Sequence, residues 1–124
     1  MEIGIENVAI VGASVKEDRY SWKAQKMLME RGHRVFPVSP LGKTVLGVNG
    51  FRSLSEISEP LDTVTLYVGP ARLSEFLVDL VAKKPRRVIF NPGTEHPRAV
   101  EILRGHGIRV EEACTLVLLT TGQF

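Results

Sequence analysis

The fold of this chain is decided by residues 8–14, Val8-Ala9-Ile10-Val11-Gly12-Ala13-Ser14. The apolar, mostly β-branched run predicts a buried strand, and the glycine after it predicts a tight turn. Residues 21–31 then show an amphipathic pattern that predicts a helix, with Ser21 as its N-cap. A buried strand that leads through a glycine turn to a helix N-terminus forms the phosphate-binding corner of a doubly wound α/β fold. We therefore expect a ligand with an anionic, nucleotide-like part.

Strands and helices are predicted to alternate along the rest of the chain. The predicted strands cover residues 7–11, 34–38, 62–68, 87–91 and 108–112. Helices are predicted after Gly69-Pro70, where apolar residues recur at helical spacing from Leu73 to Val81, and over residues 97–104. Residues 114–120 fit either a further strand or a short buried helix. This alternation predicts one Rossmann-like domain over residues 1–124, with a five-stranded parallel sheet in the order 3-2-1-4-5 and helices on both faces.

Composition limits the function classes. The chain has 124 residues, 44% hydrophobic and 24% charged, and a net charge of +2. These values are typical of a globular domain and do not indicate a nucleic-acid partner. Cys114 is the one cysteine, which excludes an internal disulfide and most cysteine metal sites, and we expect no metal. We find no signal peptide and no apolar run that could span a bilayer, so we expect a cytoplasmic protein without a membrane partner.

Small and turn-forming residues gather where the predicted strands end. Because ligands of open α/β sheets bind at the carboxyl ends of the strands, we expect these residues to share one site. The segments are Gly12-Ala13-Ser14, Ser39-Pro40, Val68-Gly69-Pro70, Asn91-Pro92-Gly93-Thr94 and Glu112-Ala113-Cys114. Arg19, Lys23 and Lys43 are candidate cations for an anionic ligand there, and the loop after the first strand is expected to supply free N–H groups.

NAD is the first nucleotide to compare with this site. The dinucleotide fingerprint requires three glycines, whereas Gly12 is followed by Ala13-Ser14-Val15-Lys16. It also requires an acidic residue at the end of the second strand, where this chain has Val38-Ser39-Pro40. An NAD(P)-binding sensor is therefore disfavoured, although it stays an alternative.

Several segments together resemble a known family. "VAIVGAS" with Arg19-Tyr20-Ser21, "GHRVFPVSP", "DTVTLYV", "VIFNPGTE" and "EACTLVLL" are similar to the small stand-alone CoA-binding proteins. Their fold is similar to the CoA-binding domain of the succinyl-CoA synthetase alpha subunit. The resemblance runs from about Asn7 to the C-terminus and implies that coenzyme A or an acyl-CoA is the bound cofactor.

The resemblance also implies where the parts of CoA would lie. The pyrophosphate would lie on Gly12, Ala13 and Ser14, beside Arg19 and Ser21. The loop from Pro40 to Lys43 would cover the nucleotide end, although "SPLGKT" matches the family pattern only loosely there. Val68, Gly69 and Pro70 would flank the adenine or the start of the pantetheine arm, and Asn91, Pro92 and Gly93 would line the path of the arm. The missing acid after the second strand agrees with CoA, because a carboxylate would repel its ribose 3′-phosphate.

No catalytic residue follows from the sequence. His96, Glu95, Glu112 and Cys114 lie at the expected edge and could form an active site, but His96 also stands where a helix N-cap is needed before Pro97. We therefore favour a binding protein without catalysis of its own. The alternatives are an acyl-CoA or thiol-transfer enzyme that uses Cys114 or His96, and a CoA-holding component of an ATP-dependent acyl-CoA ligase system with a separate partner.

Overall fold

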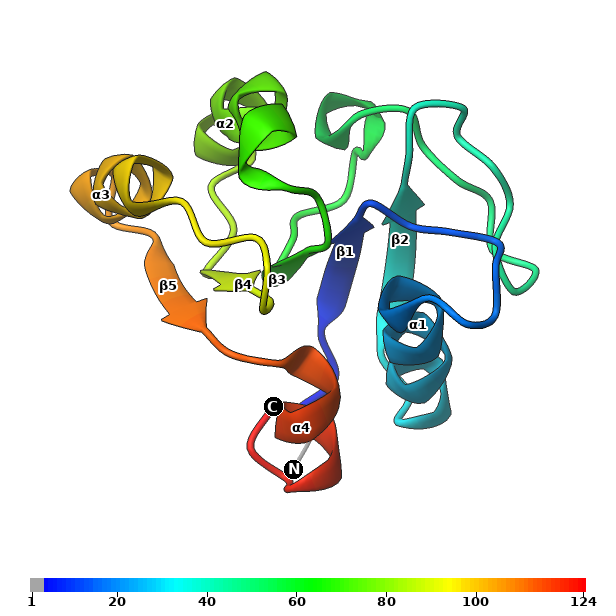
Figure 1. The fold of residues 1–124 in the computed structure, drawn as a ribbon. Helices are drawn as coiled ribbons and strands as arrows, with labels where there is room; N and C mark the ends of the chain where they lie inside the picture. Colours follow the sequence, from blue (N-terminus) through cyan, green and yellow to red (C-terminus); the bar gives the residue numbers. More distant parts are fainter. Residues whose placement is uncertain (1–3) are drawn as a thin grey trace.

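Five short strands form the parallel sheet at the centre of this computed structural model, which describes residues 4–124 (Figure 1). The strands are β1 (Asn7–Val11), β2 (Arg34–Val38), β3 (Thr63–Leu66), β4 (Arg87–Phe90) and β5 (Arg109–Glu112). The helices are α1 (Tyr20–Glu30), α2 (Pro70–Lys83), α3 (Pro97–Gly105) and α4 (Thr115–Thr120), with a 3-10 turn, η1 (Leu54–Glu56). The predicted Rossmann-like α/β fold is confirmed.

The predicted strand order is wrong in one respect. The sheet has the order β2-β1-β3-β4-β5, so β3 lies between β1 and β4 and β2 lies at the edge. All four residues of β3 are buried, as a central strand requires. β2 contains Pro37, which lacks an N–H donor and is tolerated in edge strands. The chain thus leaves β1 toward one side of the sheet and β3 toward the other, which creates a crevice between β1 and β3.

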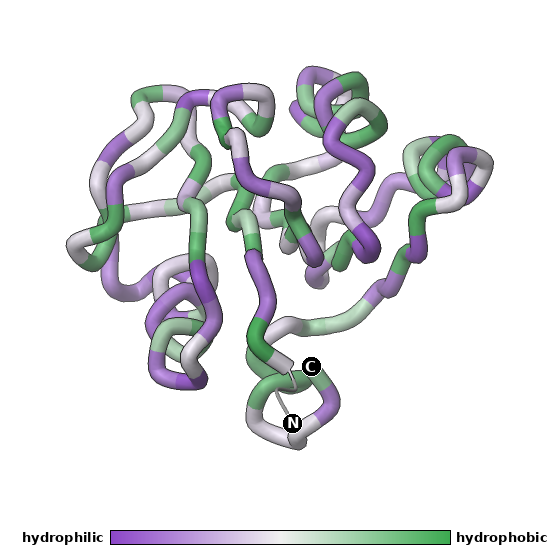
Figure 2. The backbone as a smooth tube through the Cα atoms, turned by 180° about the vertical axis from the view of Figure 1, so that it is seen from behind, coloured by the Kyte–Doolittle hydropathy of each residue, from purple (hydrophilic) through white to green (hydrophobic). Residues whose placement is uncertain are grey.

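Helices cover the two faces of the sheet in pairs. α1 and α4 pack on one face, where Val8 and Ile10 of β1 meet Leu28 and Leu119. α2, α3 and η1 cover the other face, and Figure 1 shows α2 and α3 on the side of the sheet away from α1 and α4. In Figure 2 hydrophilic and hydrophobic residues alternate along the helical turns, as expected for helices that bury one face.

The start of α1 differs from the prediction, and α4 decides between the two interpretations that the C-terminal segment allowed. α1 begins at Tyr20 with Arg19 in the N-cap position, so Ser21 is not the cap; it lies inside the first turn and is buried. Residues 114–120, which fit two interpretations, form α4 and not a strand. Among residues 4–124, no helix is long and apolar enough to cross a membrane.

Candidate functional site

Three cavities lie in a row along the carboxyl edge of the sheet. The central cavity, about 300 Å³, is lined by Gly12, Ser14, Arg19, Tyr20, Ser21, Tyr67, Val68, Gly69, Pro92, Gly93 and Thr94. The β2-side cavity, also about 300 Å³, is lined by Ala13, Ser14, Val15, Lys16, Ser39, Pro40, Leu41, Lys43 and Val45. The α4-side cavity, about 230 Å³, is lined by Tyr20, Tyr67, Asn91, Pro92, Cys114 and Leu116. Ser14 belongs to the first two cavities, and Tyr20, Tyr67 and Pro92 belong to the central and α4-side cavities, so the three are contiguous.

Most of the predicted site residues line this row of cavities. The exceptions are Lys23, Pro70, Glu112 and Ala113, which line none of the three. Lys23 is exposed and its Nζ lies 5.7 Å from the centre of the Tyr20 ring. The sequence reasoning missed Tyr20 and Tyr67. Tyr67 could have been found from the sequence. Side chains alternate between the two faces of a strand, so Tyr67, which directly follows β3, lies on the same face as Thr63 and Thr65.

Gly12 brings the backbones of β1 and β3 together at the crevice. Its φ is +92°, and a Cβ there would lie 2.8 Å from the carbonyl oxygen of Tyr67. The N–H groups of Gly12 and Ala13 both donate to the carbonyl oxygen of Val38, at 2.9 and 3.0 Å. The expectation that the turn offers free N–H groups is therefore wrong for these two residues. Gly12 has a structural role in addition to any contact with a ligand.

The N-terminus of α1 supplies the free donors instead. No side chain caps this 11-residue helix, and its first turn contains no acidic residue. The backbone N–H groups of Tyr20, Ser21 and Trp22 donate to no acceptor within residues 4–124. The first N–H of the helix that does donate is that of Lys23, to the Arg19 carbonyl oxygen at 3.1 Å. Tyr20 and Ser21 line the central cavity. This helix end therefore offers an anion both its amides and the positive end of its dipole.

Cations accompany these amides. Arg19 lines the central cavity, and Lys16 and Lys43 line the β2-side cavity. All three are exposed, and none forms an ion pair with a residue in the range 4–124. Glu17 and Asp18 belong to the same loop, but they are exposed and line none of the three cavities. The row thus presents positive charge at its central and β2-side parts.

The loop after β4 is held by its own side chains. Asn91 is buried, and its Nδ2 donates to Thr65 Oγ1 at 2.7 Å and to the Leu66 carbonyl oxygen at 2.9 Å. Its Oδ1 accepts from the N–H of Thr115 at 2.8 Å, which fixes the start of α4. The N–H of Gly93 donates to the Glu95 carboxylate at 3.0 Å; the N–H of Glu95 itself and then this Gly93 bond lower the pKa of that carboxyl. Asn91 therefore shapes the cavity wall, with its own amide already satisfied.

The candidate catalytic residues do not converge. His96 caps α3, because its Nδ1 accepts from the N–H of Ala99 at 3.1 Å, and it lines none of the three cavities. Cys114 lines the α4-side cavity, whereas Glu112 lines a separate hollow beside α3. In the described part of the chain, no group of three His, Cys, Asp or Glu residues could hold a metal ion.

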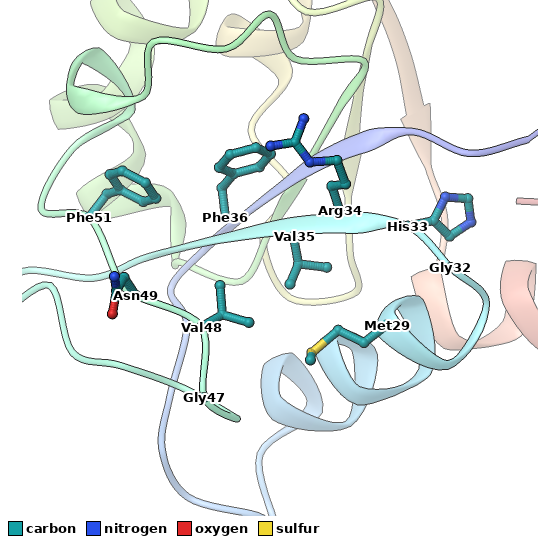
Figure 3. Close-up of a pocket in the computed structure, with 10 residues that line it drawn as sticks. All are labelled: Met29, Gly32, His33, Arg34, Val35, Phe36, Gly47, Val48, Asn49 and Phe51. Atoms are coloured by element: carbon teal, nitrogen blue, oxygen red, sulfur yellow. The ribbon is translucent and has the colours of Figure 1, made fainter.

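A larger hollow than these three lies elsewhere, at the outer edge of β2. It measures about 600 Å³, and Figure 3 shows Arg34, Phe36 and Phe51 on one side of the β2 ribbon and Val35, Val48 and Met29 on the other. Its two titratable side chains already have partners: Arg34 contacts Glu59 at 3.4 Å, and His33 Nδ1 accepts from the N–H of Glu6 at 3.0 Å. Size alone therefore does not identify the site, and the row at the carboxyl edge is the better candidate.

Comparisons with known proteins identify relatives of this chain and of its fold. A solved structure of an uncharacterized protein has a TM-score of 0.90 and 40% identity, over 98% of this chain and 99% of that one. Acetyl-coenzyme A synthetase 1 of Ca. Korarchaeum cryptofilum shares the fold, with a TM-score of 0.74 and 16% identity over 84% of this chain and 25% of that one.

A curated relative, the uncharacterized protein YneT of Bacillus subtilis (strain 168), is 36% identical over 62 residues, which is 50% of this chain. The chain spans 46% of the length of that relative in this match. The family model described as a CoA binding domain matches residues 6–120. Because this match covers nearly the whole sequence, the chain belongs to the CoA binding domain family.

Proposed function

We propose that this chain binds coenzyme A or an acyl-CoA along the row of three cavities and does so without catalysis of its own. The observation that carries the proposal is the uncapped N-terminus of α1, which opens on the central cavity beside Arg19. Pyrophosphate needs donors and positive charge in one place, and this helix end supplies both.

The order of the cavities supports an extended ligand of this kind. The β2-side cavity, with Pro40, Lys16 and Lys43, would take the nucleotide end and its 3′-phosphate. The central cavity would take the pyrophosphate on Ser14, Ser21 and the α1 amides, with Val68, Gly69 and Gly93 beside the start of the arm. The arm would then pass Pro92 and Asn91 toward the α4-side cavity.

A binding role without catalysis is supported by the hydrogen bonds and the neighbours of the candidate catalytic side chains. His96 is used as a helix cap and Glu95 as the acceptor of the Gly93 N–H. Cys114 has neither a histidine nor a carboxylate among the residues that line its cavity. A thiol without an adjacent base lacks the usual activation of a nucleophile.

A thermal-shift titration with CoA, dephospho-CoA, ADP and NAD tests the proposal. At 100 times Kd, a ligand that binds only the native state adds about 2.7 kcal/mol of stability, or very roughly 10 °C in Tm for a chain of this size. We expect a shift with CoA, a smaller one with dephospho-CoA and none with NAD. A shift with NAD but not with CoA would overturn the proposal. Steady turnover of an acyl-CoA by the purified chain would overturn the absence of catalysis.

A further inference from the structure

We propose that the α4-side cavity receives the acyl group of a short, uncharged acyl-CoA; this inference rests on the proposed function and deepens it. The cavity lies beyond the central cavity from the β2 side, and shares Tyr20, Tyr67 and Pro92 with it. A ligand whose phosphates lie at α1 would therefore reach this cavity with the end of its arm.

The walls of the α4-side cavity are neutral. Within the described chain its lining residues are Tyr20, Tyr67, Asn91, Pro92, Cys114 and Leu116, none of which has a charged side chain at neutral pH. Burial raises the pKa of Tyr67 to about 12, so this phenol stays protonated. Lys23, which lies over the Tyr20 ring, does not line the cavity. A carboxylate placed here would lose its hydration without gaining a cation.

The buried amide of the wall is already paired inside the protein. The Asn91 amide makes its three hydrogen bonds inside the protein, to Thr65, Leu66 and Thr115. The hydroxyls of Thr65 and Thr115, behind the wall, bond each other at 2.8 Å. The buried Asn91 amide therefore needs no further polar partner, and the wall offers an acyl end the tyrosine rings, Pro92 and Leu116, which favours an aliphatic group over a charged one.

The volume limits the length of the acyl group. The cavity measures about 230 Å³, whereas an apolar protein cavity of ~150 Å³ accepts one benzene ring. Groups of the size of acetyl to butyryl fit this space, and a long fatty chain does not. Each methylene that becomes buried should tighten binding about fourfold.

Isothermal titration of the purified chain with CoA, acetyl-CoA, butyryl-CoA and succinyl-CoA tests the inference. Butyryl and succinyl groups have the same number of carbons and differ by a terminal carboxylate. We expect butyryl-CoA to bind about fifteenfold more tightly than acetyl-CoA, because it buries two more methylenes, and succinyl-CoA to bind no more tightly than acetyl-CoA. Equal affinity for CoA and butyryl-CoA, or tighter binding of succinyl-CoA, would overturn the inference and leave the proposed function intact. Failure of CoA itself to bind would instead overturn the proposed function.

A matched pair of variants locates the acyl group. Leu116 lines the cavity, whereas its neighbour Val117 is 54% exposed and does not line it. Leu116→Trp should bring the ratio of the CoA and butyryl-CoA dissociation constants close to one, and Val117→Trp should keep the ratio of the unaltered chain. A preserved ratio in Leu116→Trp would overturn the assignment to this cavity. The ligand series on the unaltered chain tests the inference even if Leu116→Trp does not fold.

Discussion

Two arginines at opposite edges of the sheet differ in their partners. One lies at the amino edge, where the parallel strands begin, and the other lies at the carboxyl edge, where the strands end. At the amino edge, Arg87 is buried and lies 3.5 Å from Glu6 and 3.2 Å from Glu111, and its guanidinium lies 4.5 Å from the centre of the Phe124 ring. At the carboxyl edge, Arg19 is exposed and has no acidic partner within residues 4–124. Arg87 is thus paired inside the protein, where it contributes to stability, whereas Arg19 stays available for the proposed ligand.

Two helices that begin at the carboxyl edge, α3 and α1, differ in the same respect: a side chain of the protein accepts a hydrogen bond from the first turn of α3 but not from that of α1. α3 is capped by His96, whose ring nitrogen accepts from the N–H of Ala99. α1 follows the glycine turn and has no side-chain cap. An N-cap side chain adds about 1 kcal/mol of stability, so an uncapped helix forgoes a gain that one substitution would supply. α2 and α4 also lack a side-chain cap, but at α1 the missing cap leaves the donors open to the proposed ligand, whereas a capping oxygen would occupy them.

The largest effect is expected at the amino edge. Arg87→Leu removes the buried cation that the half-buried Glu6 and Glu111 share and leaves them only the exposed Arg86 and Arg109, and it should lower the free energy of unfolding by about 3 kcal/mol. Urea denaturation measures this loss. Arg98→Leu, at an exposed position of α3, is the control and should change stability little. The affinity for CoA should stay the same in both, and a weakened affinity in Arg87→Leu would contradict the separation of the two edges.

Arg19→Asp should change binding and stability in opposite directions. Arg19 occupies the N-cap of α1 with extended backbone angles, φ −81° and ψ 142°, which suit a capping carboxylate. The variant should gain about 1 kcal/mol of stability and lose CoA affinity. Arg19→Ala separates the two causes: it should weaken CoA binding by about 1–3 kcal/mol without the gain in stability. Isothermal titration and urea denaturation give the two quantities, and unchanged affinity in both variants would remove Arg19 from the site.

His96→Ala tests the capped helix start. Loss of the bond to Ala99 should lower the free energy of unfolding by about 1 kcal/mol and leave the CoA affinity unchanged. His106→Ala, at the other end of α3 where the side chain is exposed, should change neither quantity. A large loss of CoA affinity in His96→Ala would give this histidine a role at the ligand that the structure does not indicate.

The sequence was sufficient for the elements that depend on local pattern. The buried run at residues 8–11, the glycine turn and the apolar stripe of α2 predict the α/β fold, because strand and helix periodicities are local properties. The strand order was wrong because it depends on which strand fills the centre of the sheet. That choice follows from the burial of both faces and both edges of β3, which no local pattern of four residues encodes.

The candidate site likewise has a part that the local sequence predicts and a part that it does not. Turn residues at strand ends predict the edge where the cavities lie, because parallel strands end together. Two details required three-dimensional contacts. The N–H groups of Gly12 and Ala13 are taken by Val38, a partner from another strand, and Tyr20 and Tyr67 join two cavities across the crevice between β1 and β3. Such pairings between distant residues cannot be derived from one sequence.

The smallest effect is expected from His33, which lies at the amino edge among paired charges. Its Nδ1 accepts from the N–H of Glu6 at 3.0 Å, and burial lowers its pKa below the ordinary value of 6.5, with Glu6 opposing the shift and Arg87 and Arg31 adding to it. A histidine whose pKa is lower in the folded state stabilises that state above the unfolded pKa and loses this contribution as the pH falls through the folded value. The free energy of unfolding should therefore fall between about pH 6.5 and pH 5 by an amount that His33→Asn removes, since an asparagine oxygen can accept the same N–H and does not titrate. Urea denaturation of both proteins across this range gives the difference, and identical pH profiles would contradict the assignment. CoA affinity should show no such difference between the two proteins, because the proton binds at the edge of the sheet opposite to the ligand.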